Sequence, residues 1–239
     1  MRSSSSAVFA LLLAMPLMGA SGGPHVYAGV QALLAAGAHT DVAGKQSGIA
    51  GGALLQFGVR GDRVGFHAEG IPPVSLPQKP SAFYGAATPQ LSLLNAAADV
   101  AIDPAARFWL GAGMTVINQR TPLPNLDQVV GSRLAGARFE VAYRRPVSAS
   151  TFVEATFGAA PHLSGADHYT FSNGSPAIDK PEVAAEEDGT FAFGVTRGTT
   201  QWLVGLRTIN FSARFALTGA AADRNNGAGA LLEWRRYVR

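Results

Sequence analysis

Residues Arg133 to Phe157 read RLAGARFEVAYRRPVSASTFVEATF, and the fold can be inferred from the pattern in this stretch. Every second residue from Ala135 to Tyr143 is apolar, and the positions between them are small or charged. After a short break at 145–150, a second alternating run ends at Phe157. Because successive side chains of a strand point to opposite faces, the stretch predicts a β-hairpin with one apolar and one ion-bearing face. Soluble sheets and membrane barrels share this pattern.

Similar runs recur along the chain and predict eight further strands, at 25–38, 49–60, 63–71, 90–102, 107–119, 189–197, 201–215 and 228–238. In the run 201–215 the apolar phase switches near Arg207, which predicts a β-bulge there.

The predicted connections alternate in length. Short ones at 61–62, 103–106, 145–150 and 198–200 are separated by longer polar or proline-rich ones, at 40–48, 73–89, 120–132, 164–188 and around 223–227. This alternation is typical of an all-β, antiparallel transmembrane β-barrel of the bacterial outer membrane. We expect one barrel domain over 23–239 with ten strands, or eight as the alternative count, and with both termini in the periplasm.

Composition narrows the function classes. The 239 residues include no Cys, which excludes disulfides, thiol catalysis and Cys-bound metals. The net charge of +3 is too small and too scattered to suggest nucleic-acid binding, and no cofactor is predicted. No apolar run of about 18 residues follows the N-terminus, so no transmembrane helix is predicted.

Residues 1–22 have the features of a signal peptide. Arg2 supplies the positive charge, residues 7–18 the apolar core, and residues 19–22 the small side chains of a cleavage site. An N-terminal anchor helix is the alternative. The segment predicts export from the cytoplasm.

Aromatic residues gather near the short turns and the C-terminus, and predict an interfacial girdle at the periplasmic side: Phe108, Trp109, Tyr143, Phe152, Trp202, Trp234 and Tyr237. Trp109 is the expected exception, because Phe108, Leu110 and Met114 form the more apolar set of its strand.

The face opposite the apolar one carries ionisable residues, which we expect to point into the lumen: Arg60, His67, Glu69, Asp99, Arg138, Glu140, Arg144, Glu154, Arg207, Glu233 and Arg235. Our first interpretation is a lumen filled by ion pairs, since small barrels are usually filled by their own side chains. The alternative is a narrow polar pore whose arginines favour anions. A soluble, lipocalin-like binder would show the inverse arrangement, with its apolar face inside.

The segment 164–188 is rich in acidic residues: Asp167, Asp179, Glu182, Glu186, Glu187 and Asp188. We expect a solvated surface loop rather than a site for a divalent cation or a basic partner. His162, His168, Asp167 and Ser172 lie close together in sequence, yet a surface His beside an Asp is usually incidental, so neither a catalytic nor a metal site is predicted.

With its ten alternating runs and its end at Trp234 to Arg239, the chain resembles the small outer-membrane β-barrels of Gram-negative bacteria, the OmpA-like and Opa-like porin group. That group often ends in an aromatic residue, and Arg239 departs from this pattern. The resemblance implies a non-enzymatic role in envelope structure or surface interaction. It also implies outer-membrane lipid, lipopolysaccharide, the barrel assembly machinery and an extracellular partner of the long loops as partners.

Some small outer-membrane barrels are enzymes. The spacing of His168 and Ser172 does not match the His-x-Ser-Asn element of the lipid A deacylases. The ten-stranded omptin proteases have barrels that extend well above the membrane, and we expect this chain to be too short for such a barrel.

Overall fold

The computed structural model describes residues 25–41, 44–75, 90–123, 128–170, 174–215 and 223–238. The predicted signal peptide, residue 172 and most of the 73–89 connection lie outside these residues. The described part contains the strands β1 His25–Asp41, β2 Gly44–Arg60, β3 Val64–Ser75, β4 Gln90–Ala101, β5 Phe108–Leu123, β6 Gln128–Pro146, β7 Thr151–Ala160, β8 Ser164–Thr170, β9 Pro176–Asp179, β10 Pro181–Arg197, β11 Thr200–Phe215 and β12 Asp223–Val238. No helix in these ranges is long and apolar enough to cross a membrane.

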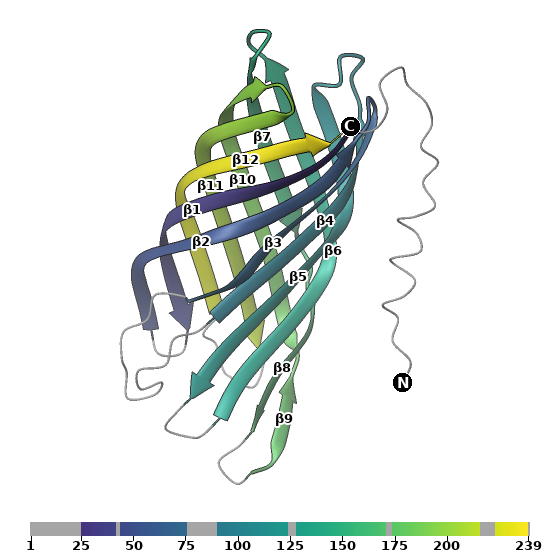
Figure 1. Cartoon of the computed structure of the whole chain (residues 1–239). Coiled ribbons are helices and arrows are strands. Elements are labelled where there is room, and N and C mark those ends of the chain that lie inside the picture. Colours follow the sequence, from purple (N-terminus) through teal and green to yellow (C-terminus); the bar gives the residue numbers. More distant parts are fainter. Residues whose placement is uncertain are drawn as a thin grey trace.

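Ten strands close into an antiparallel barrel in the order β5-β4-β3-β2-β1-β12-β11-β10-β7-β6, and β6 pairs back to β5 (Figure 1). The first and last strands pair in continuous register from Val26–Val238 to Thr40–Arg224. Closure leaves no long free sheet edge among these ten strands. The prediction of a ten-stranded barrel is therefore confirmed, and the count of eight is wrong.

The barrel has two different ends. The connections 61–63, 102–107, 147–150 and 198–199 lie at one, together with the described C-terminal residues, and we call it the turn end (Figure 1). At Gly198 the tight turn needs a φ of 59°, in the left-handed region that glycine tolerates. The opposite end is called the loop end.

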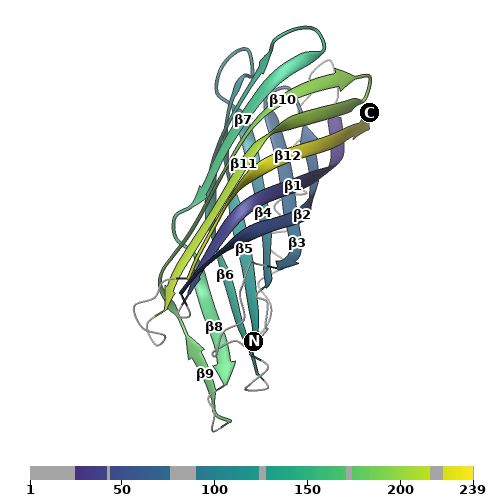
Figure 2. The ribbon, with the colours of Figure 1, turned by 90° about the vertical axis from the view of Figure 1, so that its left-hand side faces the viewer.

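At the loop end the strands β8 and β9 form a hairpin that projects beyond the barrel (Figure 2). β8 takes the place of β7 beside β6, at Gly131 to Ala135. The prediction of a solvated surface loop at 164–188 is therefore wrong. The density of acidic residues indicated a loop, but the alternation of β10 continues back through this segment. Glu186 and Asp188 pair inside the barrel, whereas Glu182 pairs with Arg214 on the outer surface.

The strands are also longer than predicted. β1 and β2 are separated by two residues and β5 and β6 by four, so the loops expected at 40–48 and 120–132 are mostly strand. β6 has 19 residues, about 60 Å at roughly 3.3 Å per residue, whereas about 9–11 residues cross a bilayer. The barrel thus extends well beyond one membrane thickness, and the expectation that the chain was too short for this is wrong.

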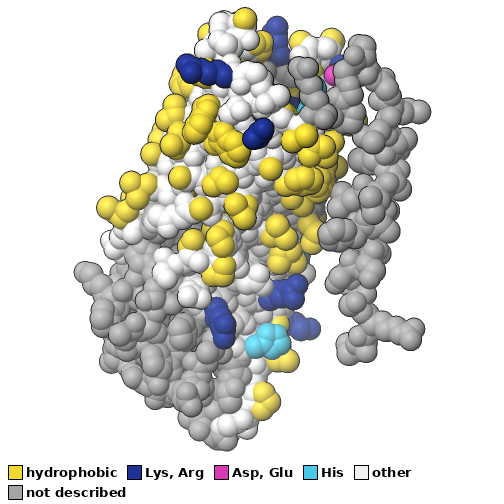
Figure 3. Space-filling model, in the orientation of Figure 1, with side chains coloured by type: hydrophobic (Ala, Val, Ile, Leu, Met, Phe, Trp, Pro, Cys, Tyr) yellow, Lys and Arg dark blue, Asp and Glu magenta, His cyan; other side chains and the backbone are white. Residues whose placement is uncertain are grey.

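The outward face carries a broad band of exposed apolar side chains (Figure 3). Leu206 on β11 is 63% exposed and Leu34 on β1 is 62% exposed. Such a surface is unfavourable in water and favourable against lipid chains. A lipocalin-like barrel would have the inverse arrangement.

The prediction of an aromatic girdle at the turn end is confirmed in part. Phe108 and Tyr143 are in contact on the outward face, with tilted rings whose centroids are 4.6 Å apart, and Trp202 pairs with Trp234 across β11 and β12. Phe152 and Tyr237 lie at inward positions instead, and so does Trp109, which was the expected exception. Their alternation parity is that of the lumen, so a place near the turn end was not sufficient to put them at the interface.

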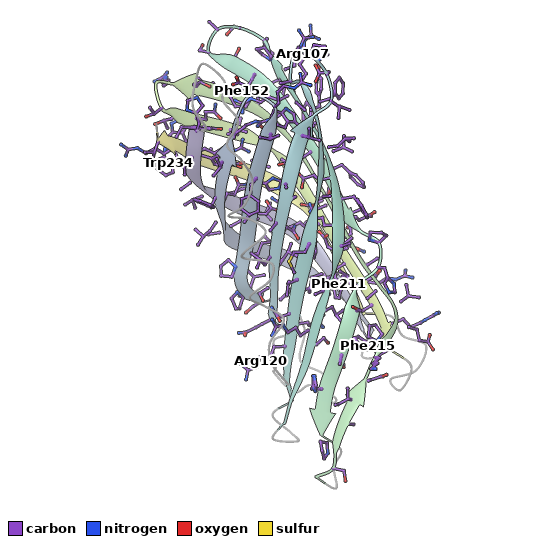
Figure 4. All side chains as sticks on the ribbon, turned by 90° about the vertical axis from the view of Figure 1, so that its right-hand side faces the viewer. Arg107, Arg120, Phe152, Phe211, Phe215 and Trp234 are labelled. Carbon is purple, nitrogen blue, oxygen red and sulfur yellow. The ribbon has the colours of Figure 1, made fainter. Side chains whose placement is uncertain are left out.

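The predicted bulge near Arg207 is wrong, because both partners of β11 keep continuous register past this residue. Ile209, Phe211 and Phe215 therefore face inward together with Arg207. Figure 4 places Phe211 and Phe215 toward the loop end and Phe152 toward the turn end. The apolar phase switches because the interior changes from ionic to apolar along the barrel axis.

Candidate functional site

All eleven ionisable residues that the sequence placed in the lumen, from Arg60 to Arg235, lie at inward-facing positions of the barrel strands. Arg138 is 2% exposed, Arg207 3% and Glu233 1%. Because buried charges need partners, the interior of the ionic half is a network of paired groups.

Sequence reasoning missed two acids of this network, Glu186 and Asp188. Both are buried on β10. The signal was present, because extending the alternation of Phe191, Phe193 and Val195 backward puts residues 186 and 188 on the inward face.

A hydrogen-bonded circuit crosses the lumen, and we call it the lumen ring. Its members are Glu69, Asn95, Thr115, Glu186, Arg138, Asp188 and Arg207. Arg207 donates to Glu69 at 2.9 Å and to Asp188 at 2.6 Å. Arg138 donates to Asp188 and, at 2.9 Å, to Glu186. The circuit is completed from Glu186 back to Glu69 by Thr115 and Asn95. The Thr115 hydroxyl lies 3.4 Å from Glu186 and donates to Asn95 at 2.8 Å, and Asn95 donates to Glu69 at 3.1 Å.

The lumen ring joins strands from opposite walls, since β3 and β11 are separated by three strands on one side of the barrel and five on the other. Long arginine side chains reach across because glycines leave space for them. A Cβ at Gly158 would lie 1.8 Å from Nη2 of Arg138. The circuit therefore depends on a small residue on β7 as well as on its own members.

A second ionic cluster lies nearer the turn end. Arg235 donates to Glu154 at 2.6 and 3.1 Å and also pairs with Glu233. Arg144 lies 3.6 Å from Glu154 and stacks 3.8 Å from the ring centroid of Phe152. The inward-facing ring of Phe152 thus contacts a cation, which is a favourable interaction.

His67, Asp99 and Glu140 form a group whose ligand atoms lie close enough together to suggest a metal centre. However, Nδ1 of His67 faces Asp99 at 2.9 Å and Nε2 faces Glu140 at 3.3 Å. The two carboxylates thus sit on different ring nitrogens, and one ion cannot take the place of both contacts. The geometry fits a histidine hydrogen-bonded by two acids better than a metal ligand set.

The interior contains spaces of different character. A wide vestibule of about 610 Å³ opens at the turn end, beside Arg60 and Trp109. Further in, a polar space of about 90 Å³ borders the ionic residues, which is room for several water molecules. On the loop-end side of the lumen ring lies an apolar cavity of about 120 Å³.

The missed acids change the charge balance of the lumen. The predicted set has five arginines and five acids, and Glu186 and Asp188 raise the acids to seven. The excess of arginine that would favour anions is therefore not present in this set.

Asp167 and His168 are adjacent on β8 and point to opposite sides of it. Asp167 is buried and accepts a hydrogen bond from Ser132 at 3.0 Å, while His168 is exposed. Burial raises the pKa of the Asp167 carboxyl above its usual range. The two side chains do not form an acid–base pair.

Comparison with known structures agrees with this architecture. The outer membrane protease OmpT from Escherichia coli matches with a TM-score of 0.57 at 9% identity, over 90% of this chain and 97% of OmpT. This is an outer-membrane β-barrel fold. Neisserial surface protein A matches at 8% identity over 90% and 99% of the two chains with a TM-score of 0.42, and Ail of Yersinia pestis at 8% over 87% and 98% with 0.31.

At these identities the likeness concerns the fold alone. No protein-family model and no curated protein matches the sequence.

Proposed function

We propose that the protein is a closed, non-enzymatic β-barrel of the outer membrane with a role in envelope structure or surface interaction, as in the OmpA-like and Opa-like group. The lumen ring is the observation that carries this proposal. It places two buried arginines and three acids across the barrel, where hydrated ions would otherwise pass. Small barrels are generally filled in this way by their own side chains.

Membrane insertion is supported by the apolar outward band and by the barrel closure, since every backbone group within lipid must find a partner. In the proposed orientation the turn end and both termini lie in the periplasm and the β8–β9 hairpin reaches outward. The hairpin and the loop-end connections would then meet an extracellular partner, and the barrel assembly machinery would insert the chain.

Lipopolysaccharide is the proposed lipid partner at the loop end. Arg120, Arg133, His168 and Arg224 are exposed there, and Figure 3 shows basic side chains and a histidine at that border of the apolar band. Arginine is well suited to phosphate, because its guanidinium can donate two parallel hydrogen bonds.

A non-enzymatic role is supported by the orientation of Asp167 and His168, which separates the acid and the base that would be needed for hydrolysis. Replacing both with Ala is expected to leave any surface activity of the protein unchanged. Loss of hydrolysis of a lipid A or peptide substrate in that variant would show that the barrel is an enzyme.

Single-channel recording in planar bilayers tests the closed lumen. We expect no conductance steps from the wild type, and steps from an Arg138→Ala/Arg207→Ala variant in which the lumen ring is cut. Arg214→Ala is the control, because Arg214 lies on the same strand as Arg207 but pairs on the outer surface with Glu182 at 2.9 Å. Defined steps from the wild type would instead support the narrow pore, the second candidate, which the vestibule and the polar space favour.

A further inference from the structure

The apolar cavity on the loop-end side of the lumen ring lies between two walls that differ in the size of their side chains. One wall consists of small residues on β1, β2 and β12, and the register places them beside one another: Ala35 beside Gly229, and Gly37 beside Gly227. A Cβ at Gly227 would meet its nearest atoms only at 3.9 and 4.0 Å, so space remains at this position.

The facing wall carries branched and aromatic side chains, among them Leu93, Ile117 and Phe211, which are 2–5% exposed. Along each of these strands, the next inward-facing residue toward the loop end after a lumen-ring position is apolar. Leu93 follows Asn95, Ile117 follows Thr115, and Ile209 follows Arg207. The cavity is therefore a separate apolar layer rather than part of the ionic network.

Its volume of about 120 Å³ compares with the roughly 150 Å³ of an engineered apolar cavity that stays dry and binds benzene. The space is thus sufficient for about one small ring or a short alkyl chain. Apart from Glu186, Asn225 and Asn226 the lining is apolar, and apolar contacts alone give no preference between such molecules.

A buried carboxylate distinguishes the cavity from a simple packing defect, and Asn225 and Asn226 also border the cavity. Glu186 borders it and has a fully buried side chain. Its Oε2 accepts a hydrogen bond from Arg138 and lies 3.4 Å from the Thr115 hydroxyl, whereas its Oε1 has no hydrogen-bond partner among the described residues. A buried oxygen without a partner is costly, and a ligand that donates to it recovers that cost.

We propose that this cavity binds an uncharged small molecule with an apolar body and one hydroxyl group, a phenol or a short-chain alcohol, which donates to Oε1 of Glu186. An anionic head group is disfavoured because it would face the Glu186 carboxylate. The proposal does not depend on whether the barrel conducts.

The test uses the full protein in lipid nanodiscs and fluorine NMR with three probes: 4-fluorophenol, 6-fluorohexan-1-ol and the hydroxyl-free fluorobenzene. Nanodiscs without protein give the background of partition into lipid. We expect saturable binding of a hydroxylated probe, and binding of fluorobenzene that is weaker than that of 4-fluorophenol by about tenfold or more, the value of a hydrogen bond to a charged group. Tighter binding of 4-fluorophenol would identify the ligand as a phenol, and tighter binding of 6-fluorohexan-1-ol would identify it as a short-chain alcohol.

Ala35→Leu fills the cavity and should abolish the saturable component. Ala32→Leu is the matched control, because Ala32 lies on the same strand but faces outward. Equal binding by these two variants would overturn the site, and equal affinity for 4-fluorophenol and fluorobenzene would overturn the role of Glu186.

A heat-dependent shift in gel mobility shows whether each variant is folded. If Ala35→Leu does not fold, Leu93→Ala enlarges the same cavity instead. That variant should bind a fluorinated naphthol that the wild type excludes, and absence of this gain would overturn the proposal.

Discussion

Removing Arg207 should destabilise the barrel far more than removing a surface arginine of the same strand. The Arg207 side chain is 2% exposed and donates to Glu69, Asp188 and Gln31 at 2.9, 2.6 and 3.1 Å. In Arg207→Ala the buried carboxylate of Asp188 and the partly buried carboxylate of Glu69 lose a counter-charge. Breaking a buried ion pair from one side costs about 3–5 kcal/mol.

We expect the lower end of this range, because Arg138 still pairs with Asp188 and Asn95 still donates to Glu69. A loss of about 3 kcal/mol corresponds to roughly a 150-fold change in the folding equilibrium. Urea unfolding of the refolded barrel in lipid vesicles, followed by tryptophan fluorescence, measures it. Adding Asp188→Asn to the variant should recover part of the loss, because the amide carries no charge.

Arg214→Ala is the control, since the side chains of Arg214 and Glu182 are 51% and 50% exposed and an exposed pair contributes about 0–1 kcal/mol. If Arg207→Ala and Arg214→Ala unfold at the same urea concentration, with equal slopes, the lumen ring does not stabilise the fold. The closed-lumen proposal would then lose its energetic basis.

Three further perturbations test other parts of the structure. Leu206 is at an outward position and is 63% exposed, so Leu206→Arg should lower the free energy of unfolding in lipid vesicles by about 2–4 kcal/mol. A change below about 0.5 kcal/mol in this free energy would argue against a lipid-facing band. Gly158→Ala should cost about 1–3 kcal/mol in the same assay, because its Cβ would overlap Arg138, whereas Gly51→Ala, with its nearest atom at 3.8 Å, should be nearly neutral. Burial raises the pKa of Asp167, so its contribution to hairpin stability is full below the unfolded-state pKa of about 3.9 and is lost as the pH rises through the folded-state pKa. Asp167→Asn should remove this pH dependence and slow amide exchange in β8 and β9 at pH 7, and an unchanged pH profile would refute it.

Much of the architecture follows from the sequence, because the direction of a side chain on a strand is a local property. Alternation places Arg138 and Glu140 on one face and Phe139 on the other, and the expectation of a membrane barrel makes the first face the inward one. The same rule holds for all eleven predicted lumen residues. The even number of strands and the short turns follow from the same runs. The length of the strands did not follow, since polar residues beyond the bilayer zone look like loops in the sequence.

Which side chains meet across the lumen depends on the closure of the barrel and the register of its strands, and both are non-local. Arg207 reaches Glu69 although 138 positions separate them in the chain. The apparent phase switch at Ile209 and Phe211 is an apolar layer inside the closed barrel. The register also places Ala35 beside Gly229, which leaves space for the cavity. Local alternation separates the two faces of each strand, but only the closed structure shows which face is inside and what fills it, because the contacts inside form between strands that are far apart in sequence.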